Sequence, residues 1–173
     1  MAKKIVFFFI LLAVIFFLGK NLNPFDPRMF DFHDDTQSAR IEQFAKNITS
    51  GIIPPRMGPD LSQGLGFPVF NFYAPASYWI TTGFHLIGIP IPLAIKTSFL
   101  LAIILSFVAM YLLLKRFFSQ EASLVGGAVY ASSLWFAIEI FIRGNLGEIW
   151  FMVFFPLSLY ILHLYSEKNS KLT

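Results

Sequence analysis

The chain has 173 residues, of which 56% are hydrophobic and 18% aromatic, and its formal net charge is +3. Only 13% of the residues are charged, whereas about a quarter are charged in a typical soluble domain. A small soluble core could not bury 22 phenylalanines, but side chains that face lipid can be apolar all round. The scattered basic residues disfavour a nucleic-acid surface and fit the ends of membrane spans. The absence of cysteine excludes disulfides, thiolate nucleophiles and cysteine-based zinc sites.

The apolar runs predict an all-α membrane protein with about four transmembrane helices. Residues 1–20 are expected to form the first of them. A cleaved signal peptide is the alternative, but this apolar run ends on bulky residues and then Lys20, rather than on small residues. Residues 97–173 are expected to hold a short cytoplasmic tail after three further transmembrane helices, over 97–114, 122–142 and 149–165.

An external loop is predicted over residues 21–75, between the first span and the rest. Within it, residues 35–50 predict an amphipathic juxtamembrane helix, because apolar residues recur at helical spacing. These apolar residues are Ile41, Phe44, Ala45 and Ile48. Residues 51–75 are rich in Gly, Pro and aromatics and predict an ordered or extended loop. Residues 76–96 are apolar but interrupted by Gly and Pro, so we expect an interfacial, re-entrant or extra transmembrane helix there.

The distribution of basic residues predicts the orientation of the chain in the membrane. With the N-terminus inside, the short inner segments hold six basic residues, namely Lys3, Lys4, Lys115, Arg116, Lys168 and Lys171. The outer loops hold the same number over a much longer length. Basic density therefore favours a cytoplasmic N-terminus and an external first loop. The turn at residues 143–148 then lies on the external side as well.

The densest polar cluster follows the first predicted span. It consists of Asp31, His33, Asp34 and Asp35. Its carboxylates could act as a general base, bind a divalent metal ion or orient a cationic group. The structural alternative is the start of the amphipathic helix, where Asp34 or Asp35 would cap free amides and complement the helix dipole. The residues by themselves leave both interpretations open.

A second polar cluster occupies residues 143–148, a Gly-containing turn with Arg143 and Glu148 at its ends. The structural interpretation is local pairing of Arg143 with Glu148, or with Glu139 at the i, i+4 spacing. The functional interpretation is that the planar guanidinium of Arg143 holds a phosphate, while Glu148 joins the acidic cluster of the first loop. These two interpretations also stay open on the residues alone.

Several ordered blocks carry a family resemblance. The blocks are His33-Asp34, the helix with Arg40, G-x-x-P-P-R at 51–56, G-x-G-x-P-x-F-N-F-Y-A-P at 64–75, and R-G-N-L-G-E at 143–148. Together they resemble the N-terminal region of C-type polytopic membrane glycosyltransferases, including the group labelled 6-pyruvoyl-tetrahydropterin-synthase-related membrane proteins. The resemblance covers nearly the whole chain. It implies sugar transfer from a polyprenyl-phosphate carrier to an acceptor on the outer face of a prokaryotic plasma membrane.

The resemblance also implies roles for individual residues. By motif match, Asp34 is the catalytic acidic residue of the first external loop, which acts near the acceptor as a base or metal contact. Asp35 is a second candidate, and Glu148 is the acidic residue of the second loop. Substrate-binding candidates are Arg143 for the carrier phosphate, with His33, Arg40, Arg56, Asn71 and Tyr73. An outer-face Asp and Glu are compatible with a divalent metal ion, the one cofactor considered. The expected partners are the lipid bilayer and the polyprenyl-phosphate-linked sugar.

Members of this family are several times longer and contain many more spans. We therefore expect the chain to be the N-terminal portion of a longer or split protein that needs its remainder for catalysis. One alternative is a small non-enzymatic membrane protein that acts as an assembly partner or a lipid-handling subunit. A transporter is disfavoured, because transporters place polar groups near the bilayer midplane and here the polar clusters lie in loops.

Overall fold

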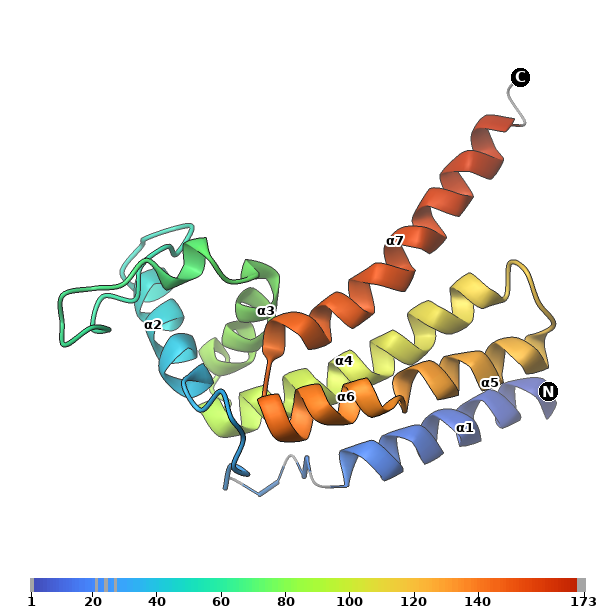
Figure 1. The fold of residues 1–173 in the computed structure, drawn as a ribbon, viewed down its shortest axis with the longest axis horizontal. Coiled ribbons are helices and arrows are strands. Elements are labelled where there is room, and N and C mark those ends of the chain that lie inside the picture. Colours follow the sequence, from blue (N-terminus) through green and yellow to red (C-terminus); the bar gives the residue numbers. More distant parts are fainter. Residues whose placement is uncertain (1, 21, 24, 27, 171–173) are drawn as a thin grey trace. The chain divides into compact units, whose positions relative to one another are not determined.

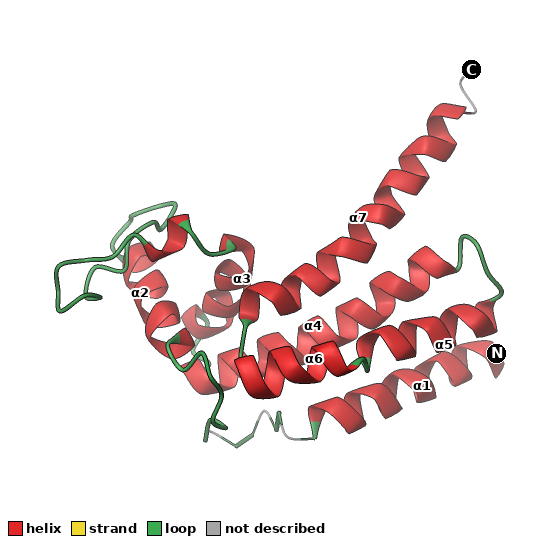
Figure 2. Cartoon of the chain, viewed as in Figure 1, coloured by secondary structure: helices red, strands yellow, loops and turns green. Residues whose placement is uncertain are grey.

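The computed structural model describes residues 2–20, 22–23, 25–26 and 28–170. Helices joined by loops make up this part of the chain, and no strand occurs in it (Figure 2), which confirms the all-α class. Among the described residues, three helical stretches are long and apolar enough to cross a membrane, namely Ile91–Leu114, Gln120–Arg143 and Leu146–Asn169. The apolar stretch described at the N-terminus, Ile5–Val14, is shorter, so a fourth span stays a prediction. Residues 171–173 of the predicted tail lie outside the described residues.

The chain divides into two compact units. The first unit comprises the described residues of 1–21, 100–137 and 151–173, and the second unit comprises those of 22–99 and 138–150. Helices α4 (Ile91–Leu114) and α7 (Leu146–Ser170) contribute residues to both. The predicted polar clusters all belong to the second unit.

In the first unit, α1 (Ala2–Gly19) packs along α5 (Gln120–Ala131), as Figure 1 shows. The ring of Phe7 on α1 lies 5.3 Å from that of Phe107 on α4, measured between centroids. A β-carbon at Gly127 of α5 would lie only 3.1 Å from the carbonyl oxygen of Phe107. Glycine at this position therefore permits the close approach of α5 to α4, as small residues do between membrane helices.

The predicted helix over residues 122–142 is interrupted. Helix α5 ends at Ala131, and the short α6 (Leu134–Ile138) and the π-helix η2 (Glu139–Arg143) follow. Ser132 lies at the break, and its hydroxyl donates to the Ala128 carbonyl at 2.6 Å. Serine side chains that bond in this way compete with the backbone hydrogen bonds of a helix. This competition explains why the apolar run does not form one straight helix.

The second unit is built on α2 (Gln37–Thr49) and α3 (Pro75–Leu86), which pack against each other. Helix α2 buries Ile41, Phe44 and Ala45 of the predicted apolar stripe. The Phe44 ring meets those of Phe70, in the short helix η1 (Val69–Asn71), and Trp79 at centroid distances of 4.8 and 5.1 Å. Aromatic packing thus joins the amphipathic helix to the segment at residues 76–96, for which an interfacial, re-entrant or extra transmembrane helix is predicted.

The loop that follows α2 is fixed onto that helix by Asp60. Its carboxylate accepts hydrogen bonds from Lys46 at 2.7 Å and from Gln43 at 3.0 Å, and its backbone N–H donates to Gln43 at 2.8 Å. The hydrogen bond from Lys46 lowers the pKa of the Asp60 carboxyl. Gly58 and Phe67 close the loop with a pair of backbone hydrogen bonds of 2.7 and 3.1 Å. The loop is therefore ordered, and it holds the chain leading to Tyr73.

A buried lysine anchors the segment that precedes the site. Lys96 on α4 is only 2% exposed, and its ammonium donates to the carbonyl oxygens of Asp26 and Arg28 at 2.8 and 2.5 Å. Carbonyl partners of this kind compensate a buried ammonium for its lost water. The hydrogen bond from Arg28 also lowers the pKa of Asp26 to about 2.

A buried polar network connects three helices of the second unit. The hydroxyl of Ser98 on α4 accepts the indole N–H of Trp150 on α7 at 2.9 Å and a hydrogen bond from Thr81 on α3 at 2.7 Å. Ser98 and Thr81 are both fully buried. The network therefore fixes the relative positions of the elements on which the site is built.

Replacement of Ser98 by alanine is expected to lower the free energy of unfolding by about 1–3 kcal/mol, because buried donors lose their acceptor. Ser106→Ala on the same helix is the matched control. Ser106 is also fully buried, but its hydroxyl has no hydrogen-bond partner among the described residues, so its removal should be neutral or stabilising. Thermal unfolding of the two variants in detergent measures the difference, and equal losses would contradict the role of the network.

Candidate functional site

The two polar clusters predicted from the sequence meet through their backbones. The N–H of His33 donates to the carbonyl of Ile142 at 2.7 Å, and that of Asp34 donates to the carbonyl of Arg143 at 3.0 Å. Ring packing of Phe30 on Phe141, at 5.5 Å between centroids, extends this contact. The segment before α2 is therefore held against the turn before α7.

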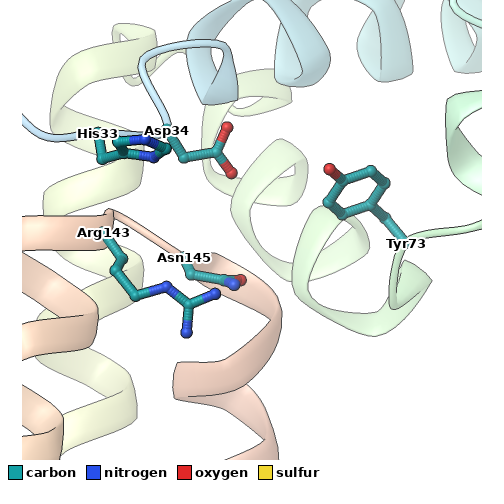
Figure 3. Close-up of a pocket in the computed structure, with 5 residues that line it drawn as sticks. All are labelled: His33, Asp34, Tyr73, Arg143 and Asn145. Carbon is teal, nitrogen blue, oxygen red and sulfur yellow. The ribbon is translucent and has the colours of Figure 1, made fainter.

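A cavity of about 330 Å³ lies where the clusters meet. It is lined by His33, Asp34, Tyr73, Arg143 and Asn145 (Figure 3). The Asp34 carboxylate points to the side on which Tyr73 lies, while Arg143 ends η2 and Asn145 lies in the turn that follows it. Three segments that are distant in sequence thus contribute an acid, a cation and a phenol to one pocket.

The Asp34 carboxylate is held by three donors. Thr36 donates to Oδ1 at 2.8 Å, while Gln37 and Arg40 donate to Oδ2 at 2.8 and 3.0 Å. A carboxylate offers about four lone-pair sites, so Oδ1 keeps one for another donor. The expected capping is corrected here: α2 begins after Thr36, and Asp34 binds side chains beside the helix start. The neighbouring Asp35 is exposed and does not line the pocket.

Arg40 connects Asp34 to two tyrosines. Its Nη2 donates to the Tyr73 hydroxyl at 3.1 Å, and its guanidinium carbon lies 4.1 Å from the centroid of the Tyr73 ring. The buried Tyr78 hydroxyl donates to Gln37 at 3.0 Å. Burial raises the pKa of Tyr78 to about 12, so this hydroxyl stays protonated at ordinary pH. Arg40 therefore orients both the acid and the phenol of the pocket.

Arg143 is bound by two carboxylates. Its Nη1 donates to Glu139 at 2.6 Å and to Glu148 at 2.9 Å, and its Nη2 also lies 2.9 Å from Glu148. The ion pairs of Arg143 with Glu139 and with Glu148, both predicted from the local spacing, are therefore present. The Arg143 side chain is still 42% exposed, and it lines the pocket, so a further anion can reach it.

Asn145 is the pocket residue that sequence reasoning missed. Its side-chain oxygen accepts the backbone N–H groups of Gly147 and Glu148 at 3.0 and 3.3 Å, at the start of α7. Its amide nitrogen donates to Glu148 at 3.0 Å. An asparagine just before an apolar run is a helix-capping signal that points to this position.

The remaining candidates lie away from the pocket lining. Glu148 reaches it only through Arg143 and Asn145, and Arg56 and Asn71 are exposed residues of the loop after α2. In the part of the chain that the structure describes, no group of three or more His, Cys, Asp or Glu side chains could hold a metal ion.

No family model, no characterised protein and no solved structure matches the chain. Fold and site together define a helical protein, suited to a membrane, with a polar pocket formed by the first loop and the turn at residues 143–148.

Proposed function

We propose that the chain is the N-terminal portion of an integral membrane glycosyltransferase. The proposed reaction transfers a sugar from a polyprenyl-phosphate carrier to an acceptor on the outer face of a prokaryotic plasma membrane. The observation that carries the proposal is the single cavity lined by Asp34, Arg143 and Tyr73. Its volume of about 330 Å³ falls in the range of small-molecule sites. The resemblance of the sequence blocks gives separate support.

In the proposed reaction, Asp34 takes the proton of the acceptor hydroxyl while that oxygen forms its bond to the anomeric carbon. The bond between the anomeric carbon and the phosphate oxygen breaks, and its electron pair leaves with the polyprenyl phosphate. Arg143 stabilises the charge of the leaving phosphate. Tyr73 offers a ring and a hydroxyl to the sugar.

The hydrogen bonds within the site support these roles. Three donors fix the Asp34 carboxylate and leave a lone pair on Oδ1. Because its orientation is set before substrate binds, little reorganisation is needed at the moment of proton transfer. Glu148 positions Arg143 in this scheme and does not act as the base, since it contacts the guanidinium directly.

Asp34→Asn is expected to reduce sugar transfer by about 10²–10⁴-fold, because an amide cannot accept the proton. The assay follows label from a panel of polyprenyl-phosphate monosaccharides in membranes that contain the complete enzyme, of which this chain is the proposed N-terminal portion. Asp60→Asn is the matched control: it also removes a carboxylate bonded to Gln43 and Lys46 in the same unit, but it lies outside the pocket. Equal activities of the two variants would refute the assignment of Asp34.

One observation favours a second function. Both Asp34 and Arg143 are already engaged by neighbouring side chains, as expected of groups that only stabilise a fold. The chain would then be a non-enzymatic membrane protein that assists assembly or handles lipid. In that case Asp34→Asn and Asp60→Asn would affect stability alone, and co-purification with partners would survive both.

A further inference from the structure

Glu139 is a buried acid that the proposed reaction does not use. Its side chain is 0% exposed, and it lies in the π-helix η2, a rare element often found at functional sites. One oxygen, Oε1, binds Arg143 at 2.6 Å. The other, Oε2, is buried without a hydrogen-bond partner among the described residues. An ionised carboxylate in this state lacks compensation for the water it has lost.

The charges around Glu139 do not balance. Glu139 and Glu148 together carry a formal charge of −2 and share Arg143, so the cluster sums to −1. On the adjoining segment, the titratable residues His33 and Asp34 pair through their backbones with Ile142 and Arg143. Asp34 is itself paired with Arg40. An anion that binds Arg143 would therefore enter a cluster that already has one negative charge in excess.

We infer that Glu139 is a proton-binding site coupled to phosphate binding at Arg143: the cluster takes up one proton when the anion binds. This inference rests on the proposed function. A phosphate on Nη1 displaces the Glu139 carboxylate, which would otherwise be left charged and buried without its cation. Protonation makes the side chain neutral. The anion adds −1 and the proton adds +1, so the charge of the cluster stays at −1.

Proton uptake gives the site a defined pH dependence. One linked proton makes phosphate binding tighter as the pH falls, by at most about tenfold per pH unit. Release of the carrier phosphate after transfer returns the proton to solvent. The carboxylate of Glu139 then rebinds Arg143 and restores the ligand-free ion pairs.

Calorimetry on the full chain in lipid nanodiscs tests the coupling. The probe is methyl farnesyl phosphodiester, which has a prenyl chain but no group that titrates between about pH 5 and 8, unlike a phosphomonoester. Binding enthalpies in two buffers of different ionisation enthalpy give the number of protons exchanged. The expected result is uptake of about one proton per probe bound by the unmodified protein.

Glu139→Gln should retain probe binding, lose the proton uptake and flatten the pH dependence. Glu167→Gln, which removes a carboxylate paired with Arg116 in the first unit, is the matched control and should keep the uptake. Probe binding by the unmodified protein without proton exchange would overturn the coupling and leave the glycosyltransferase proposal intact. Proton uptake that persists in Glu139→Gln would also overturn the coupling and leave the glycosyltransferase proposal intact. A failure of the unmodified protein to bind the probe would count against the proposed function itself.

Discussion

Gly144→Ala is expected to lower the free energy of unfolding by about 2–5 kcal/mol, the sum of a left-handed backbone and an overpacked contact. Gly144 has a φ of 66°, and a β-carbon there would lie 2.1–2.6 Å from three ring carbons of Phe32. The ring belongs to the segment that carries His33 and Asp34, so the substitution should also distort the pocket. Thermal unfolding in detergent measures the loss.

A matched control separates the two contributions. Gly51 has a φ of 78°, but a β-carbon there would meet no heavy atom within 4 Å. Gly51→Ala should therefore lower the free energy of unfolding only through the left-handed backbone conformation, by about 1–2 kcal/mol. Combining Gly144→Ala with Phe32→Val should recover part of the loss. If the two glycine variants lose equal stability, the contact with Phe32 has no energetic importance.

Arg143→Gln is expected to destabilise the protein by about 3 kcal/mol, because it leaves the buried Glu139 carboxylate without its cation. The loss should shrink as the pH is lowered, since protonation removes the unpaired charge. The double variant with Glu139→Gln should regain most of the stability. Unfolding temperatures of the three proteins at two pH values give the measurement.

Arg28→Gln serves as the control for Arg143→Gln. Arg28 also pairs with a carboxylate, that of Asp26 at 2.9 Å, but its side chain is 86% exposed. An exposed pair of this kind contributes about 0–1 kcal/mol. Comparable losses in the two arginine variants would mean that burial of Glu139 does not set the energy of the cluster.

Features with a short sequence period or a local spacing could be predicted from the sequence. The helical spacing of Ile41, Phe44, Ala45 and Ile48 predicts a buried face; α2 buries the first three, and Ile48 is half-buried. The pairs that Arg143 forms with Glu139 and Glu148 follow from a spacing of four and five residues. In each case, the interacting residues are only a few positions apart in the sequence.

Features that depend on distant partners could not be predicted in this way. No local pattern marks Lys96 as buried; it is only 2% exposed in α4, and carbonyl groups 70 and 68 positions away accept its hydrogen bonds. Likewise, Arg40 reaches Tyr73 across 33 positions. The π-helix at Glu139 leaves no periodic pattern in the sequence, since it is a single wide turn of only five residues.

The backbone pairing of residues 33–34 with residues 142–143 has a consequence for biosynthesis. His33 and Asp34 emerge early from the ribosome, whereas Ile142 and Arg143, which hold them in place, emerge close to the end of this stretch of chain. Until then, the acid and the guanidinium belong to separate, unjoined segments. The pocket therefore forms only after the turn before α7 has been synthesised, when the backbone carbonyls of residues 142–143 can pair with residues 33–34.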